Sequence, residues 1–424
     1  MKRLTKKTGL TGALTIPGDK SISHRALMLS ALAEGVSSIY GMGDGRDCRS
    51  TMDCLRSLGI RIDKKEDRIL VHGRGLHGLR APEGPLDAGN SGTTLRLLSG
   101  ILAGQDFVSV IGGDPSLNSR PMERIIKPLT RMGAGIGSMG GNGCAPLRIS
   151  GGRLKGIHYD SPVASGQVKS CILLAGLYGD GITSVSEPGI SRDHTERMLP
   201  LYGVRLLREG RTCTVVPPER LRAVEYTVPG DISAAAYFLA AGLIVPDSSL
   251  LLKDVGINET RAGFLQACRL MGADLDVGNI REVCGEPMAD IRVRTSDLQG
   301  ITIGGEMIPS LIDELPLLAL LACHAQGETV IKDAGELRVK ESDRIALVTE
   351  NLKKMGADIT AREDGFVIRG GKTLRGASIS CGGDHRIAMT FAVAGINASG
   401  TTLIPDSDCV AVSDPDFFTR LESL

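Results

Sequence analysis

The sequence predicts an α/β protein of two domains that is built from repeated units of about 70 residues. Its 424 residues exceed the ~250–300 that a single hydrophobic core usually serves. Its 55 glycines indicate many tight turns rather than a bundle of long helices. A short motif also recurs, in which an apolar residue is followed by Gly and then by Ala, Ile or Val. Its glycines are Gly59, Gly133, Gly203, Gly272 and Gly356.

Each recurring glycine closes a helical pattern and precedes a strand. In the fifth copy Ile345, Val348, Leu352 and Met355 follow helical spacing, and Gly356 stands just past the last turn. Glycine is favoured there because a helix commonly ends on a residue with left-handed backbone angles. The strand-like segment Ala-Asp-Ile-Thr follows. Helix, glycine stop and strand therefore form one unit.

A second recurring phrase opens each unit with polar or Gly residues, followed by an apolar helix, a Gly-containing turn and a β-branched strand. It begins near Lys20, Asn90, Ser165, Asp231, Asp313 and His385. Six starts predict six copies of a βαβα-type unit, of which the C-terminal copy is truncated.

A second, more widely spaced sequence repeat predicts how the copies group into domains. The sequence Thr-Ile-Pro-Gly-Asp-Lys at 15–20 returns as Thr-Val-Pro-Gly-Asp-Ile at 227–232, where a new group of three copies begins. Pro-Gly pairs suit passages between domains, so we expect passages near 16–19 and 228–231. The expected domains are 1–17 with 230–424, and 18–229, with the site in the cleft between them. The alternative is two tandem domains that share no strand.

Composition argues against nucleic acid and membrane partners. Lys plus Arg equals Asp plus Glu at 49 each, aromatic residues make up 3%, and Trp is absent. The ten cysteines are scattered without zinc spacing, which is typical of free thiols in a reducing cytoplasm. The basic start at 1–7 precedes no apolar leader segment, and the most apolar run, 234–245, is about half of the ~20 residues that a spanning helix needs. We therefore expect a cytoplasmic protein without a membrane segment.

The starts of the first helices favour binding of small anions. Helix N-termini offer free backbone N–H groups and the positive end of the helix dipole to phosphates and carboxylates. The residues there suit such ligands: Lys20, Ser21, Ser23 and Arg25 in copy one, Asn90 and Gly92 in copy two, Ser165 and Gln167 in copy three. The alternative for each single stretch is a plain helix cap.

The starts of the second helices add arginines in a comparable pattern. Arg46 and Arg120 stand 13 residues before their closing glycines (59 − 46 and 133 − 120), and Arg192 stands 11 before Gly203. Copy five is densest in charge, with Glu336, Arg338, Lys340, Glu341, Asp343 and Arg344, and copy six adds Asp384, His385 and Arg386. Arg forks match carboxylates and phosphates. A solvated helix face is the alternative.

Asp313 and Glu314 open the apolar helix of copy five, where a helix-capping Asp is the plain interpretation. Near Lys340 and Glu341 they also suit a site that moves protons, with one carboxylate as base and another as acid. The spacing assigns neither role. No P-loop, H-E-x-x-H or G-x-S-x-G motif occurs, and Gly41-Met-Gly43-Asp-Gly45 lacks the full dinucleotide spacing.

These segments resemble the EPSP synthase family, the 3-phosphoshikimate 1-carboxyvinyltransferases, over essentially the whole chain. The matching segments are Pro-Gly-Asp-Lys20-Ser21-Ile-Ser-His-Arg25, Gly89-Asn90-Ser-Gly92-Thr-Thr, Ser119-Arg120-Pro-Met, Asp313-Glu-Leu-Pro, Arg338-Val-Lys340-Glu341-Ser-Asp-Arg344 and Asp384-His-Arg386-Ile-Ala-Met. The resemblance implies a two-domain inverse α/β barrel with three βαβαββ units per domain, a monomer, and no metal or organic cofactor. It also implies transfer of the enolpyruvyl group of phosphoenolpyruvate to the 5-hydroxyl of shikimate 3-phosphate.

The resemblance further implies roles for single residues. Those implied to hold shikimate 3-phosphate are Lys20, Ser21, Arg25, Ser165, Gln167, Arg192, Asp313 and Lys340. Those implied to hold phosphoenolpyruvate are Lys20, Asn90, Gly92, Arg120, Gln167, Arg344, His385 and Arg386. Asp313, Glu341 and Lys20 are implied to be catalytic, with Asp313 taking the proton of the 5-hydroxyl and Glu341 moving the proton at the methylene carbon. A methyl group at Gly92 is implied to crowd the inhibitor glyphosate.

Two departures and two alternatives qualify the resemblance. Val412 stands where the family often has a Lys that contacts phosphoenolpyruvate, and Gly166 leaves only backbone contact where relatives often have Ser or Ala. The UDP-N-acetylglucosamine enolpyruvyl transferases resemble this fold but use a loop Cys, which 112–121 lacks. A non-catalytic phosphometabolite-binding protein is disfavoured because Asp313, Lys340 and Glu341 are retained.

Overall fold

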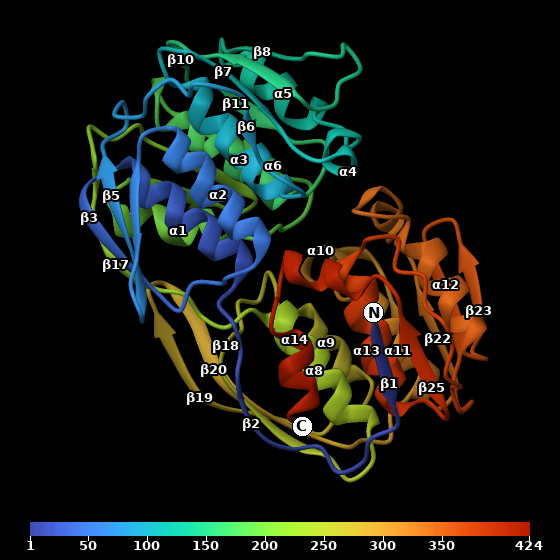
Figure 1. Cartoon of the computed structure of the whole chain (residues 1–424). Helices are drawn as coiled ribbons and strands as arrows, with labels where there is room; N and C mark the ends of the chain where they lie inside the picture. Colours follow the sequence, from blue (N-terminus) through green and yellow to red (C-terminus); the bar gives the residue numbers. More distant parts are fainter. The chain divides into compact units, whose positions relative to one another are not determined.

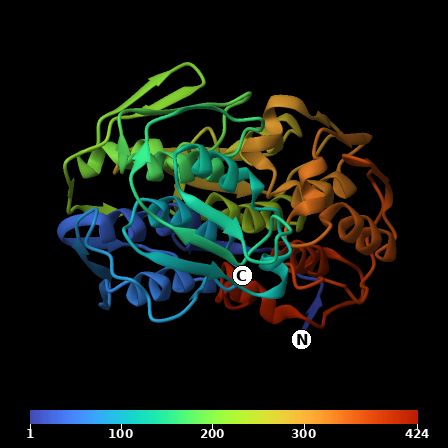
Figure 2. The same cartoon turned by 90° about the horizontal axis from the view of Figure 1, so that it is seen from above.

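The computed structural model describes residues 1–424, and their helices and strands fall into two compact units (Figure 1). Unit 1 comprises Met1–Pro17, Pro229–Glu282 and Pro287–Leu424. Unit 2 comprises Gly18–Val228 and the hairpin tip Val283–Glu286. Each unit has its own hydrophobic core. Both chain ends belong to unit 1 (Figure 2), where Lys2 Nζ donates to Glu422 Oε1 at 2.8 Å.

Six helices that open the repeats are apolar on nearly all sides and are correspondingly buried. They are α1 (Lys20–Leu32), α3 (Gly92–Ala103) and α6 (Gly166–Gly176) in unit 2, and α8 (Ile232–Ile244), α11 (Leu315–His324) and α13 (His385–Asn397) in unit 1. Five of them begin at a side chain that accepts a hydrogen bond from a backbone N–H of the first turn: Asp19, Ser91, Ser165, Asp231 and Asp384. Only α11 lacks such a cap.

The second helices are more polar. They are α2 (Arg46–Ser57), α5 (Glu123–Arg131), α7 (His194–Met198), α9 (Gly263–Leu270), α12 (Arg344–Lys354) and, at the C-terminus, α14 (Phe417–Glu422). The first five of them are followed by the recurring glycines, in the case of α7 after a short 3₁₀ helix (Leu199–Tyr202). The five recurring glycines all have left-handed φ angles of 86°, 103°, 87°, 83° and 89° in chain order. These values confirm the predicted helix stops, because only glycine adopts this conformation without steric cost.

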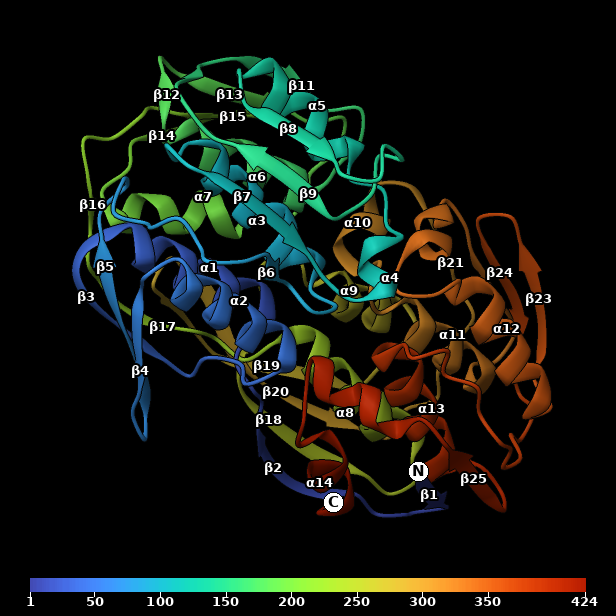
Figure 3. The ribbon, with the colours of Figure 1, turned by 45° about the horizontal axis from the view of Figure 1, so that its top comes forward.

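Each complete repeat forms a sheet with one strand order. A first strand runs parallel to the strand that follows the first helix, and the closing hairpin continues the sheet antiparallel. In unit 2 the sheets are β16 (Leu221–Arg222) and β17 (Glu225–Thr227) with β3 (Ala33–Tyr40), β5 (Arg68–Arg74) and β4 (Arg61–Lys64); β6 (Leu86–Asp87), β7 (Val108–Gly112), β9 (Leu147–Ser150) and β8 (Gly135–Ser138); and β11 (His158–Asp160), β13 (Thr183–Ser186), β15 (Thr212–Val215) and β14 (Leu206–Glu209). Figure 3 labels β6 to β9 side by side.

Unit 1 repeats this order and takes two of its strands from the N-terminus. Its sheets are β2 (Thr11–Thr15), β18 (Ser249–Gly256), β20 (Glu286–Arg294) and β19 (Leu275–Val283); β21 (Thr302–Ile303), β22 (Glu328–Ile331), β24 (Gly365–Arg369) and β23 (Asp358–Arg362); and β1 (Lys2–Thr5) with β25 (Thr401–Ile404). β2 runs parallel to β18, and β1 runs antiparallel to β25. The α/β class is confirmed, whereas the closure of each unit into a barrel stays a prediction.

None of the helices, taken alone, combines the length and the apolar composition that spanning a lipid bilayer requires. One pair, Gly305–Leu311 with Leu315–His324, reaches the required length and composition only when both pieces are counted, and it is bent by 108° between them.

Asp414, in the segment before α14, gives the fold a specific pH dependence. It is 2% exposed, and burial raises its pKa from the ordinary 3.8 to about 6. The positive charge of Arg420 opposes this rise but is outweighed by it. Because the folded protein then keeps a proton that the unfolded chain loses, the free energy of unfolding falls as pH rises between these values. Between pH about 4 and about 7, the free energy of unfolding of the wild type, measured in urea, should fall by up to about 3 kcal/mol relative to that of Asp414→Asn. Glu422→Gln, on α14 at a 55% exposed side chain, is the control and should run parallel to wild type.

Candidate functional site

Four cations and four carboxylates gather in unit 1 and are called here the unit 1 charge cluster. Its members are Arg261, Lys340, Arg344 and Arg386, and Asp313, Glu314, Glu341 and Asp384. They come from the starts of α9, α11, α12 and α13 and from the segments just before them. Residues at or just before helix starts of copies four, five and six are therefore joined by ion pairs in one set of charged groups.

Arg344, the first residue of α12, lies at the centre of this cluster with a fully buried side chain. Its Nε donates to Asp384 Oδ2 at 2.8 Å, its Nη2 to Glu341 Oε2 at 2.6 Å, and its Nη1 to Asp313 Oδ1 at 3.4 Å. Burial alone would lower the pKa of Arg344, but Asp384 and Glu341 outweigh it and raise the pKa. One guanidinium thus holds three carboxylates in fixed relative positions.

Asp313 faces four cations and does not cap α11. Glu314 occupies the capping position, so the helix-cap interpretation of Asp313 is wrong. Besides Arg344, its carboxylate lies 3.7 Å from Arg386 Nη2, 3.8 Å from Lys340 Nζ and 4.0 Å from Arg261 Nη2. Its side chain is 12% exposed. The attraction of four positive charges outweighs the single backbone hydrogen bond that a cap would gain.

Glu341 and Lys340 are the more accessible members, with 23% and 26% of their side chains exposed. Partial burial lowers the pKa of Lys340. The carboxylate of Asp313 has the opposite effect but does not outweigh burial. Asp313 and Glu341 contact different terminal nitrogens of Arg344. Two carboxylates on one guanidinium fork can serve as a base and an acid that act on neighbouring atoms of one substrate.

The start of α13 is tied to the start of α12 through Asp384. Its Oδ1 accepts from Arg386 N at 2.9 Å, and its Oδ2 accepts from Arg344 Nε and, at 2.9 Å, from Ser342 Oγ. Burial would raise the pKa of Asp384, but Arg344 lowers it further. His385 is buried in the same turn between Asp384 and Arg386.

Unit 2 brings together the predicted residues at the starts of α3 and α6. Arg120 Nη2 donates to Asn90 Oδ1 at 2.7 Å, and Asn90 Nδ2 donates to Asp114 Oδ2 at 2.8 Å. Gln167 accepts from Arg96 Nη1 at 2.7 Å and donates to Thr93 Oγ1 at 3.0 Å.

Gly92 stands between these two guanidinium groups. A methyl group at Gly92 would lie 3.1 Å from Arg96 Nη1 and 3.5 Å from Arg120 Nη1. Asn90, Gly92, Arg120 and Gln167 thus share one polar surface.

Arg25 lies inside unit 2 as a fixed cation. Its Nε donates to Thr195 Oγ1 at 2.7 Å, Nη1 to Ser21 O at 2.7 Å and Nη2 to Ser170 Oγ at 2.8 Å. Burial lowers the pKa of Arg25 to about 10, against Glu196, which raises it. Lys20, at the first residue of α1, makes its ion pair with Asp47 of α2 at 2.9 Å.

The start of α6 explains the two small residues there. Ser165 caps the helix by accepting from Val168 N at 3.4 Å, so the plain cap interpretation holds for this side chain. A Cβ at Gly166 would lie 3.0 Å from Arg192 Cβ and 3.1 Å from Arg192 O. The segment that carries Arg192 therefore packs directly on Gly166 and would have to shift by a few tenths of an ångström to admit a side chain there.

Sequence reasoning missed Arg96 and Arg261. Arg261 stands 11 residues before Gly272 (272 − 261), the same interval that singled out Arg192, so the repeat pattern could have found it. It donates to Glu314 Oε2 at 3.0 Å. Arg96 lies four residues after Gly92, one helical turn along α3, which places it on the same face. Glu314 was recognised in the sequence only together with Asp313 and was given no role of its own.

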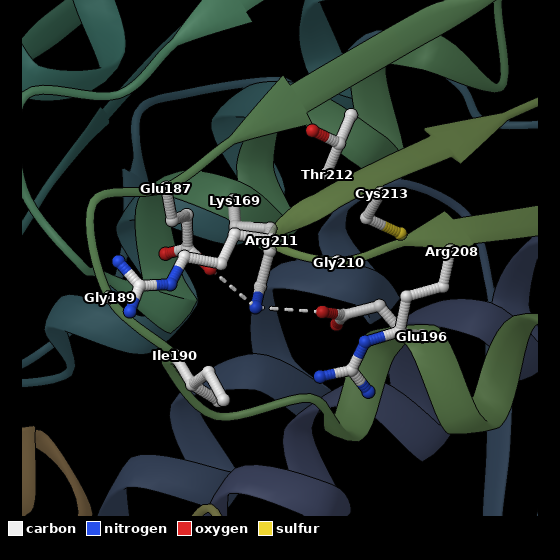
Figure 4. Close-up of a pocket in the computed structure, with 10 residues that line it drawn as sticks. All are labelled: Lys169, Glu187, Gly189, Ile190, Glu196, Arg208, Gly210, Arg211, Thr212 and Cys213. Carbon is white, nitrogen blue, oxygen red and sulfur yellow. Dashed lines mark ion pairs between the residues drawn. The ribbon is translucent and has the colours of Figure 1, made fainter.

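An open pocket of about 280 Å³, part of it solvent, lies elsewhere in unit 2 (Figure 4). Lys169, Glu187, Glu196, Arg208 and Arg211 are its charged lining residues. None of the residues that the sequence predicts for substrate lines it. All ten cysteines are free, and no three or more His, Cys, Asp or Glu side chains form a group that could hold a metal ion.

Comparison with known proteins places the chain in one family. The model of the family described as EPSP synthase (3-phosphoshikimate 1-carboxyvinyltransferase) matches residues 4–421. The chain is 55% identical over 420 residues to the 3-phosphoshikimate 1-carboxyvinyltransferase of Gloeobacter violaceus, covering 99% of this chain and 97% of that protein. It is 52% identical over 417 residues to that of Bacillus thuringiensis strain Al Hakam, covering 98% and 97%. The structure of EPSP synthase from Acinetobacter baumannii matches with a TM-score of 0.88 at 46% identity, over 99% of this chain and 97% of that chain. The chain therefore belongs to the EPSP synthase (3-phosphoshikimate 1-carboxyvinyltransferase) family.

Proposed function

We propose that this enzyme transfers the enolpyruvyl group of phosphoenolpyruvate to the 5-hydroxyl of shikimate 3-phosphate and releases phosphate, as a step of the shikimate pathway to aromatic amino acids. The observation that carries the proposal is the position of Asp313 and Glu341 on one buried guanidinium, with three further cations around Asp313. The full-length relatives carry the same activity in their names.

The reaction needs two proton movements that carboxylates can perform. The methylene carbon of phosphoenolpyruvate gains a proton, and the 5-hydroxyl oxygen loses its proton as it bonds to the neighbouring carbon. The methyl group so formed then gives up a proton as the bond to phosphate breaks, so that no net proton is consumed within the transferred group. We assign Asp313 to the hydroxyl proton and Glu341 to the proton on carbon, with Lys20 as a further catalytic cation.

The binding assignments use the cations of each unit. In unit 1, Arg344, Arg386 and His385 are assigned to phosphoenolpyruvate, and Asp313 and Lys340 to shikimate 3-phosphate. In unit 2, the residues assigned to phosphoenolpyruvate are Lys20, Asn90, Gly92, Arg120 and Gln167, and those assigned to shikimate 3-phosphate are Lys20, Ser21, Arg25, Ser165, Gln167 and Arg192. Arg forks bind carboxylate and phosphate with two parallel hydrogen bonds. The fixed, buried guanidinium of Arg25 supports its assignment, because little conformational entropy remains to be lost on binding.

We further propose a monomer that works in the cytoplasm with these two small substrates as its partners. Ten free cysteines suit a reducing compartment. Sedimentation of the purified protein at working concentration tests the monomer, and a dimer mass would contradict it.

A phosphate-release assay tests the proposed function. Release is expected only when phosphoenolpyruvate and shikimate 3-phosphate are present together. Release with UDP-N-acetylglucosamine in place of shikimate 3-phosphate would assign the enzyme to the other enolpyruvyl transferases. Binding of both ligands without release would identify a binding protein.

Gly92→Ala tests the surface between Arg96 and Arg120. The new methyl group meets Arg96 Nη1 at 3.1 Å, so the flexible end of that side chain must yield by a few tenths of an ångström while the backbone keeps its conformation. The variant should fold, and its inhibition constant for glyphosate should rise at least about tenfold while KM for phosphoenolpyruvate rises less. Full sensitivity in the variant, or strong resistance in the wild type, would mean that other residues decide inhibitor binding.

A further inference from the structure

A buried charge triad stands behind the start of α6. Lys169 Nζ lies 2.7 Å from Glu187 Oε2 and 2.7 Å from Glu196 Oε1, and the three side chains are 6%, 3% and 5% exposed. Figure 4 shows the ammonium group between the two carboxylates. Burial alone would lower the pKa of Lys169, but Glu196 and Glu187 outweigh it and raise the pKa, so the lysine stays charged.

Glu187 connects the triad by hydrogen bonds to the two segments that carry proposed substrate ligands. Its Oε1 accepts from Ser165 N at 2.9 Å and from Ser191 Oγ at 2.7 Å. Lys169 Nζ also donates to Ser191 O at 3.4 Å. The cap of α6 and the loop that ends in Arg192 are therefore held by the same two side chains.

The loop and the helix start are in direct contact, so their positions are linked. A Cβ at Gly166 would lie 3.0 Å from Arg192 Cβ and 3.1 Å from Arg192 O, tighter than an ordinary van der Waals contact. Any shift of the loop must move Ser165, Gln167 and Arg192 relative to one another. Close-packed contacts transmit such shifts because they leave no free volume to absorb them.

We infer that Lys169 is a positioning residue for shikimate 3-phosphate, acting through Glu187 on the start of α6 and the loop before Arg192. This inference rests on the proposed function and adds to it a residue that does not touch substrate. Glu196 completes the triad but contacts neither Ser165 nor Ser191 in this network, so its role is to neutralise and hold the lysine.

The pocket beside the triad makes a rescue experiment feasible. Its other cations are already engaged, since Arg208 Nη1 lies 3.2 Å from Asp193 Oδ2 and Arg211 donates to Pro188 O. Lys169 lines this pocket. A guanidinium at position 169 keeps the positive charge and can donate to both carboxylates through separate N–H groups, so arginine is the conservative variant for the rescue.

The experiment compares Lys169→Met with Lys169→Arg in steady-state kinetics of phosphate release. Lys169→Met should raise KM for shikimate 3-phosphate about tenfold, with KM for phosphoenolpyruvate and kcat changed less than about threefold. Lys169→Arg should restore KM to near the wild-type value. Lys127→Met is the matched control, since Lys127 is a lysine of the same unit on α5 with a 71% exposed side chain, and its KM should stay near wild type.

The outcomes separate positioning from plain structural support. Equal rises in both KM values, equal effects of Lys169→Met and Lys127→Met, or no rescue by arginine would overturn the positioning role. If Lys169→Met does not fold, Glu187→Gln decides in its place, with the same selective rise in KM expected. A wild-type enzyme without phosphate release would overturn the proposed function instead. Calorimetric titration with shikimate 3-phosphate would then decide on Lys169, because unchanged affinity in Lys169→Met overturns the inference.

Discussion

Replacing Asp313 by Ala should lower kcat by about 10²–10⁴-fold, the usual loss when a general acid or base is removed. Binding of the substrates should weaken far less. Four cations face the Asp313 carboxylate at 3.4–4.0 Å, and without it their positive charge is available to anionic ligands. Initial rates of phosphate release over a grid of both substrate concentrations separate kcat from the two KM values.

Glu341→Gln should show the same pattern, because it keeps the shape of the side chain and removes only its ability to take up and release a proton at neutral pH. Glu350→Ala is the control, since Glu350 lies on α12 with a 54% exposed side chain and pairs only with Lys354 in the helix surface. Unchanged kcat in both Asp313→Ala and Glu341→Gln would refute the assigned proton transfers.

Replacing Arg344 by Met should reduce the free energy of unfolding by about 3–5 kcal/mol, the cost of breaking a buried ion pair from one side. Asp384 is fully buried and would lose its nearest cation, and Glu341 and Asp313 would lose theirs. Urea unfolding at neutral pH measures the difference, provided that the slope with denaturant is unchanged.

The loss should shrink in acid. Because Arg344 holds the pKa of Asp384 below its ordinary 3.8, this pair stabilises the wild type above that pH, and the stabilisation disappears as pH falls through the lowered value. Lys354→Ala, on the same helix with a 42% exposed side chain, should cost less than about 0.5 kcal/mol. A loss in Arg344→Met no larger than in Lys354→Ala would contradict the central place of Arg344.

Features that depend on a few neighbouring residues could be read from the sequence. The five recurring glycines were predicted as helix stops because left-handed backbone angles are a local requirement, and all five adopt them. Helix starts at Asp19 and Ser165 follow from capping chemistry in the same way. The relatives carry the family assignment, which local pattern alone would have left at an anion-binding enzyme.

Features that depend on distant partners could not be read in this way. A local rule makes Asp313 a helix cap, but cations from three other elements turn its carboxylate away, and Glu314 takes the capping position. Gln167 meets Arg96 across 71 positions of sequence, which no periodicity in either helix encodes. Substrate roles for these residues stay predictions until kinetics tests them.

The place of β1 has a consequence for how the chain is made. β1 pairs with β25, which ends at Ile404, so a nascent chain that grows by ~5–20 residues per second exposes its first strand for roughly 20–80 s before the partner exists. All of unit 2 except Val283–Glu286 lies in the continuous segment Gly18–Val228 and can form its core in the meantime. An unpaired strand is a template for aggregation, and lysines blunt it. Lys2, Arg3, Lys6 and Lys7 place four positive charges in and directly after β1, the composition that disfavours such pairing.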